Sequence, residues 1–133
     1  MTKLKSLIII LLLFLLVIPQ VLAQRVYDHR GRYMGRVHDE RFYDSRGVVL
    51  GWLDDNKLYD SRGRNLGKIE DGRLYDATGQ LLGWVDGSML YDRTGRFVGR
   101  IEGDLIYDGA GRFMARAHGL RQKEIVLFFF FYL

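Results

Sequence analysis

The sequence contains no cysteine, only three histidines and no clustered run of basic residues. Without cysteine there is no disulfide framework, so backbone hydrogen bonds and an apolar core must hold the fold together. His29, His38 and His118 are scattered, and no cysteine nucleophile, paired-glycine motif or metal-spaced cluster accompanies them. These absences predict a protein that is not an enzyme and carries no cofactor or metal. The 20 Lys and Arg are evenly mixed with 16 Asp and Glu, which does not indicate a nucleic-acid surface.

The first 23 residues differ from the rest. Lys3 and Lys5 precede an apolar run from Leu7 to Ile18, and Val21-Leu22-Ala23 follows Pro19. A positive start, an apolar run and a small-residue site predict a helical signal peptide over residues 1–23, cleaved after Ala23. The alternative is an uncleaved anchor, for which the run is short of the ~20 residues that cross a bilayer. The prediction places the protein in the periplasm, in the cell envelope or outside the cell.

From Tyr27 onward a sixteen-residue unit repeats without a slip, with units starting at Tyr27, Tyr43, Tyr59, Tyr75, Tyr91 and Tyr107. A strand repeats every two residues, so an even step returns each side chain to the same face of a sheet. A helix would drift by about 160° per unit and would have to absorb repeated glycines. Residues 24–117 are therefore predicted to form one all-β domain.

Each unit contains two turn signals. The first is an Asp-x-x-Gly segment after each tyrosine, in which Asp accepts backbone N–H bonds and Gly takes positive φ. Its members are Asp28 and Gly31, Asp44 and Gly47, Asp60 and Gly63, Asp76 and Gly79, Asp92 and Gly95, and Asp108 and Gly111. The second lies at Asp71-Gly72, Asp86-Gly87 and Glu102-Gly103, with looser versions at residues 38–40 and 55–56. Turn capping explains the repeated Asp better than a ring of Ca²⁺ ligands does.

The ends of the repeat region predict how it closes. The first unit opens abruptly after Arg25 and the last stops half-way at Ala117, so the two ends can pair and remove the exposed edges. The result would be a closed, radially symmetric, shallow barrel of six short β-hairpins. An open solenoid is the alternative, but it needs polar capping repeats that the sequence lacks.

Three positions of the unit are apolar and are the core candidates: position eight, position eleven and the residue before each tyrosine. Position ten instead holds long amphipathic side chains, namely Arg36, Trp52, Lys68, Trp84, Arg100 and Arg116. Such side chains can cover apolar surface while reaching water or a lipid headgroup. Trp52, Trp84, Arg36 and Arg100 are therefore candidates for contact with a membrane or a ligand.

Residues 118–133 form a Phe-rich C-terminal tail whose last nine residues, from Ile125, are all apolar. As a helix these nine would reach only about 14 Å, too short to span a bilayer. They could dip into one leaflet, bind a partner, fill the mouth of the ring or dock on their own domain. Phe128, Phe129, Phe130 and Phe131 are the remaining candidates for membrane or ligand contact.

Tandem YDSRGRxLGxI-type units at sixteen-residue spacing, a closing half-unit and the Phe-rich end together resemble the bacterial β-flower proteins, in particular the five-fold type. The resemblance implies a shallow radial barrel of hairpins, similar in outline to the tubby-like barrel, with no established activity. Five complete periods lie between Tyr27 and Ile106, and a sixth hairpin follows if the ends pair. YD repeats of secreted toxin shells and MORN repeats share some of these residues but differ in period.

Two functions remain open from the sequence. The first is an exported, non-enzymatic structural or binding module at the bacterial envelope, associated with membrane lipid through its hydrophobic tail. The alternative is a carrier of a small apolar ligand in the axial channel of the ring. The sequence leaves the oligomeric state open.

Overall fold

The computed structural model describes Lys5, Ser6, Ile8 and residues 24–133. The predicted signal peptide falls almost wholly outside these residues. Residues 24–133 contain twelve strands and one helix, in this chain order. They are β1 (Arg25–Asp28), β2 (Tyr33–His38), β3 (Arg41–Asp44), β4 (Val49–Asp54), β5 (Lys57–Asp60), β6 (Asn65–Glu70), β7 (Arg73–Asp76), β8 (Leu81–Asp86), β9 (Met89–Asp92), β10 (Phe97–Glu102), β11 (Leu105–Asp108), β12 (Phe113–His118) and α2 (Gln122–Tyr132).

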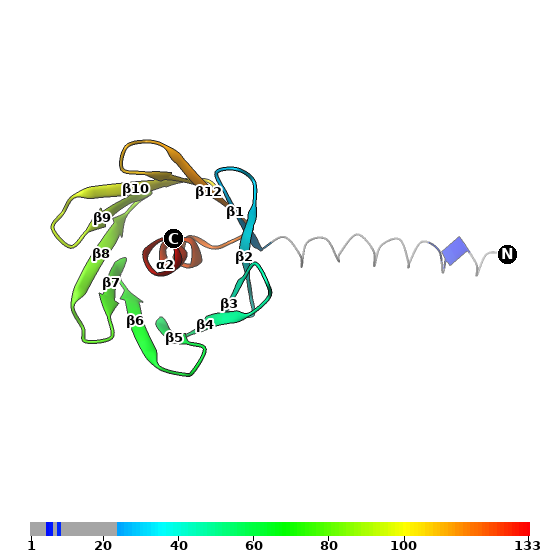
Figure 1. Cartoon of the computed structure of the whole chain (residues 1–133), viewed down its shortest axis with the longest axis horizontal. Coiled ribbons are helices and arrows are strands. Elements are labelled where there is room, and N and C mark those ends of the chain that lie inside the picture. The colour runs from blue at the N-terminus through cyan, green and yellow to red at the C-terminus, as the bar shows by residue number, and fades with distance from the viewer. Residues whose placement is uncertain (1–4, 7, 9–23) are drawn as a thin grey trace.

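The strands form one closed antiparallel barrel of six hairpins, as predicted, and Figure 1 shows them arranged as a ring. Each strand pairs with its neighbours in the chain, and β1 pairs with β12 to close the ring. This closing pair, the seam, runs from Arg25 opposite His118 to Asp28 opposite Ala115. Each of the six hairpins is continuous in the chain around one Asp-x-x-Gly segment. Neighbouring hairpins are joined by a turn of the chain at five places, and the seam joins the first hairpin to the last. The open solenoid is excluded.

The six Asp-x-x-Gly segments form the turns inside the hairpins, here called the Asp turns. In the turn after β7, Asp76 Oδ1 accepts hydrogen bonds from the backbone N–H groups of Thr78 and Gln80, at 2.9 and 3.0 Å. The Asp76 carbonyl accepts a third from Gly79. The same pattern recurs in all six turns.

The aspartates and glycines of the Asp turns therefore occupy the turn positions that the sequence predicts. The six glycines all adopt positive φ, between 79° and 86°, and each donates its N–H to the carbonyl of its aspartate. The aspartates are Asp28, Asp44, Asp60, Asp76, Asp92 and Asp108, and the glycines are Gly31, Gly47, Gly63, Gly79, Gly95 and Gly111.

The turns between hairpins, here called the tight turns, occupy residues 39–40, 55–56, 71–72, 87–88 and 103–104. Two predicted positions were therefore one residue early, since Gly87 and Gly103 are the first turn residues and not the second. The two segments predicted to be looser are equally tight turns, with φ of 49° at Asp39 and 61° at Glu40, and of 47° at Asp55 and 70° at Asn56. The even repeat fixes the strand register and with it the position of each tight turn. This constraint outweighs the local preference of such turns for glycine.

Two of the three predicted core columns are buried inside the barrel, apart from Val85 of the eleventh column, which is partly buried. The residues before each tyrosine, such as Phe42, Leu58 and Leu74, are fully buried, and Val37 and Leu53 of the eleventh column are almost so. The eighth column, such as Leu50, is only half-buried. Each odd strand shifts register against the following even strand near this position, and the irregularity leaves these side chains partly at the surface.

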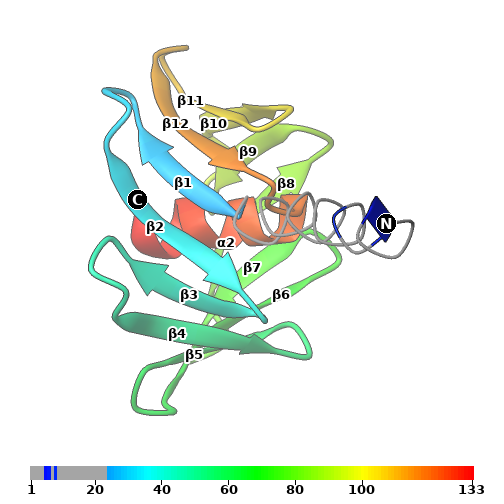
Figure 2. The ribbon, with the colours of Figure 1, turned by 90° about the vertical axis from the view of Figure 1, so that its right-hand side faces the viewer.

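Helix α2 lies on the axis of the barrel, where Figures 1 and 2 show it surrounded by strands. Four consecutive residues, Ile125 to Phe128, are buried, which requires cover on every side of the helix. Eleven helical residues span about 16 Å, close to the ~20 Å of a six-residue strand. The sequence left several places open for the C-terminal tail. The structure therefore shows that the tail lies in the interior of the ring.

Candidate functional site

The inner wall of the barrel carries a column of glycines at position nine of the repeat. Four of them face four consecutive aromatic residues of α2. A Cβ atom built at Gly83 would lie 2.8 Å from the Phe130 ring, and one at Gly99 would lie 3.1 Å from the Phe129 ring. Gly67 faces Phe131 in the same way and Gly51 faces Tyr132. These glycines are seats that let the aromatic rings approach the sheet.

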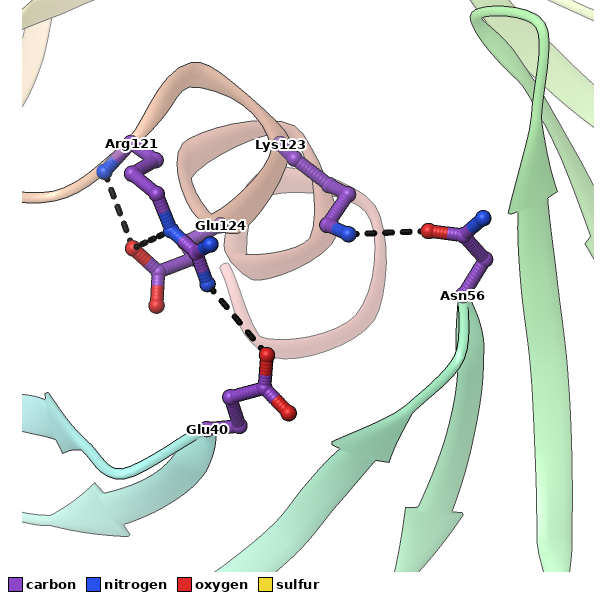
Figure 3. A network of polar contacts seen from close by, with 5 residues as sticks. All are labelled: Glu40, Asn56, Arg121, Lys123 and Glu124. Carbon is purple, nitrogen blue, oxygen red and sulfur yellow. Dashed lines mark hydrogen bonds and ion pairs between the residues drawn. The ribbon is translucent and has the colours of Figure 1, made fainter.

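The first turn of α2 is tied to the tight-turn rim by polar contacts, shown in Figure 3. Buried Glu124 accepts hydrogen bonds from Arg121 N at 2.9 Å and Arg121 Nε at 3.2 Å. The Arg121 guanidinium also reaches Glu40 at 3.7 Å, and Lys123 Nζ donates to Asn56 Oδ1 at 2.8 Å. The Glu124 carboxylate raises the pKa of Arg121 by hydrogen bonding and by charge. These bonds fix the depth and the rotation of the helix.

The last turn of α2 ends in the half of the barrel that carries the Asp turns. Burial raises the pKa of Tyr132 to about 12, with a smaller contribution from the charge of Asp60. The Tyr132 hydroxyl is buried and has no hydrogen-bond partner within the described residues. Its ring packs on Phe42 at 5.4 Å and on Phe128 at 5.5 Å between centroids. The contribution of Tyr132 is therefore apolar packing.

These contacts determine whether the axis of the barrel has space for a ligand. Phe128 is 2% exposed and Phe129, Phe130 and Phe131 are partly buried against the core. The tail fills the space in which the sequence allowed an apolar ligand. In the part of the chain that the structure describes, none of the helical segments has the length and apolar character of a transmembrane span.

The outer wall carries the tenth-column side chains, here called the belt: Arg36, Trp52, Lys68, Trp84, Arg100 and Arg116. Five of the six lie over the tyrosine of the next strand. Trp52 stacks on Tyr59 at 5.9 Å and Trp84 on Tyr91 at 5.6 Å, both with 22° between the planes. The cations of Arg36, Lys68 and Arg100 lie 4.4, 5.3 and 4.6 Å from the corresponding ring centroids.

The strand order divides the belt into two sides. Trp52, Lys68 and Trp84 belong to β4, β6 and β8, on successive hairpins, and form the tryptophan side. Arg100, Arg116 and Arg36 belong to β10, β12 and β2, also successive because the ring is closed, and form the arginine side. The predicted contact residues Trp52 and Trp84 thus share one side and Arg36 and Arg100 the other. The four phenylalanines lie apart from both, on the axis.

The glycines of the Asp turns lie apart from the axial helix, exposed at the surface. A Cβ atom built at Gly47 or Gly111 would meet no atom within 4 Å. Two of the glycines instead lie beside the belt: a Cβ at Gly63 would be 3.7 Å from the Trp52 ring, and one at Gly95 would be 3.6 Å from the Trp84 ring. The turn glycines therefore shape the hairpins, and two of them also border the tryptophan side.

The Asp turns offer no metal centre in the part of the chain that the structure describes, where no three His, Asp or Glu side chains are grouped to hold an ion. Hydrogen bonds from backbone N–H groups lower the pKa of the turn carboxyls; the bond from Arg32 is the largest cause at Asp28, and the bond from Val48 is the largest at Asp44. At Asp76 and Asp92 the hydroxyls of Thr78 and Thr94 contribute most. The carboxylates are thus occupied as turn acceptors.

Comparison with known proteins adds one match. A family model described as "5-fold beta-flower protein" matches residues 23–133, which covers the whole barrel and α2. A search of curated proteins and a search of solved structures found no match.

Proposed function

The chain belongs to the 5-fold beta-flower protein family, and on that premise we propose that it is an exported, non-enzymatic binding module of the bacterial envelope that contacts membrane lipid with its outer wall. The main observation behind this proposal is that α2 fills the axis of the barrel. Because α2 occupies the interior, a partner must bind outside the barrel. Export rests on the pattern of residues 1–23.

The tryptophan side is the part of the wall that best suits a bilayer interface. Indole and phenol rings with an apolar body and a polar edge concentrate at the headgroup level of membranes. Trp52 and Trp84 flank Lys68, whose stem covers apolar surface. The Lys68 ammonium group pairs with Glu70 at 3.0 Å, and anionic headgroups would replace this partner. Only one side of a closed barrel can contact a flat membrane at a time. Both tryptophans lie on the same side, so they can contact the membrane together.

The C-terminal tail was the first candidate for membrane contact, and the alternative function was an apolar ligand on the axis. Either would require α2 to leave the barrel, because Ile125 to Phe128 are buried and the glycine seats are occupied. Release would expose these apolar side chains and open the core. The geometry therefore favours contact through the wall with the helix in place.

Intrinsic fluorescence provides a direct test, because the chain contains two tryptophans and both are in the belt. Full-length protein is mixed with vesicles of phosphatidylethanolamine and phosphatidylglycerol. We expect a blue shift of the emission and co-flotation with the vesicles. Trp52→Ala with Trp84→Ala should abolish flotation, whereas Arg36→Ala with Arg100→Ala, a matched pair on the other side, should retain it. An unshifted spectrum, or equal flotation of both double variants, would contradict the proposal.

A further inference from the structure

The seam interrupts the symmetry of the barrel, and a groove lies on the outside there. The groove has a volume of about 480 Å³ and is lined by Tyr27, Asp28, His29, Gly31, Phe113, Arg116 and His118. It joins the first and last hairpins, at the centre of the arginine side. Its volume is within the range of small-molecule sites.

Arg116 is the belt residue that differs from the others. It lies opposite Tyr27 in the register of the seam, as Arg100 lies opposite Tyr107. Arg100 covers its tyrosine and also reaches Glu102 at 3.4 Å. Arg116 is exposed and makes neither an ion pair nor a ring contact within residues 24–133. Its five donors are therefore available to a ligand.

Most charged groups around Arg116 are cations or are carboxylates that already have hydrogen-bond partners. The Asp28 carboxylate accepts hydrogen bonds from Arg30 N, Arg32 N and Arg32 Nε, and its side chain is only 18% exposed. It therefore competes little for Arg116. His118 lies 3.5 Å from Asp104 through Nδ1, which leaves Nε2 to face a ligand, and Nε2 donates to an anion when the imidazole is protonated. His29 adds a second imidazole on the opposite wall of the groove.

An apolar surface completes the groove. Phe113 is a large hydrophobic residue that is 38% exposed, and the Tyr27 ring lies in the same lining. Aromatic faces of this kind stack on flat rings and on the C–H faces of sugars. A guanidinium beside such a surface binds carboxylate or phosphate in a bidentate manner.

We propose that the seam groove is a binding site for a small anion carried on a ring, with Arg116 holding the carboxylate or phosphate and Phe113 and Tyr27 packing against the ring. His29, and His118 when its imidazole is protonated, supply further hydrogen bonds to the anion. The proposal is independent of the proposed membrane contact, since the groove is on the side of the barrel away from Trp52 and Trp84.

The test uses full-length protein labelled with ¹⁵N and titrated with three probes: 4-hydroxybenzoate, phenyl phosphate and D-glucuronate. We expect amide shifts confined to the groove, at Gly31, Phe113 and His118 among others. Shifts with the aromatic probes alone identify an aromatic acid, and shifts with glucuronate alone identify an acidic sugar. No groove shift with any of the three would overturn the proposal.

Matched variants separate a site from general electrostatics. Arg116→Gln should weaken binding of the effective probe by about tenfold or more, the usual effect of a lost charge-assisted hydrogen bond. Arg100→Gln, the same substitution at the same repeat position one hairpin away, should leave the affinity within about twofold. Equal losses in the two variants, or equal binding of the uncharged probe phenol, would show that Arg116 is not the anion ligand.

Discussion

The ring of Phe130 lies directly against Gly83, so that a single added methyl group would bring the two within 2.8 Å. This contact joins the eighth strand to the axial helix. The same relationship steps round the barrel, because each successive aromatic residue of α2 meets the glycine of the previous even strand. Barrel and helix therefore form one packed unit.

The glycine seats should tolerate alanine to different degrees. A Cβ at Gly83 would clash with the Tyr91 carbonyl oxygen and with Phe130, whereas at Gly99 the Tyr107 carbonyl oxygen is 2.7 Å away and Phe129 is 3.1 Å away. We expect Gly83→Ala to cost about 1–3 kcal/mol of unfolding free energy, and Gly99→Ala to cost less. Urea unfolding followed by circular dichroism measures both. A larger loss of unfolding free energy for Gly99→Ala than for Gly83→Ala would show that steric clash does not determine what these positions tolerate.

The axial helix should not accept a charge at its centre. Val126 is fully buried, so Val126→Asp places an unpaired carboxylate in the core and should cost about 3 kcal/mol or more. Leu133→Asp is the control, since Leu133 is 39% exposed and is the C-cap residue of the same helix. Thermal unfolding should show a large loss for the first variant and a small change for the second. Similar melting temperatures would argue against an internal helix.

The Tyr132 hydroxyl should influence stability at alkaline pH. Its folded-state pKa is raised from 10.0 to about 12 by burial, so the neutral phenol is favoured in the folded protein. The associated stabilisation is present below pH 10 and is lost as the pH rises from 10 to about 12. Tyr132→Phe should therefore flatten the alkaline fall in unfolding free energy. At pH 7 the variant should be at least as stable as the parent, because the hydroxyl has no partner among the described residues.

The Asp turns should make the barrel sensitive to acid. Their pKa values are lowered from 3.8 by hydrogen bonds to the carboxylates. A lowered folded-state pKa stabilises the protein above about pH 4, and the stabilisation is lost as the pH falls through the folded-state values. Asp76→Asn should reduce the loss of melting temperature between pH 5 and pH 3. Asp86→Asn, in β8 and outside the Asp turns, should reduce it less.

Closure of the barrel could be predicted because every unit repeats the same turn-forming and apolar residues at an even period. The Asp turns depend on contacts within five residues, such as Asp76 with Thr78 and Gln80. The location of the tail could not be predicted in this way. A run that is apolar at every position has no helical or strand period, and burial inside a ring depends on contacts between residues far apart in the sequence.

A signal for the internal helix was nevertheless present. The glycine at position nine has no turn to form, and its repetition indicates close approach of another group. Glu124, three residues after Arg121, accepts a hydrogen bond from the Arg121 backbone N–H, which is one half of a capping box. The groove at the seam had no comparable signal, because its lining residues from the two ends of the barrel, such as His29 and Arg116, come to border one groove only when the ends pair.

The most direct test of the central claim is the position of the aromatic rings of α2 relative to the glycine column. Nuclear Overhauser spectra of the folded protein should show contacts from Phe129, Phe130, Phe131 and Tyr132 to the Hα protons of Gly99, Gly83, Gly67 and Gly51, respectively. With the helix on the axis, all four pairs should appear together, with the glycine protons shifted upfield by the rings. Absence of these contacts in protein whose β1–β12 amide contacts are intact would contradict an internal helix.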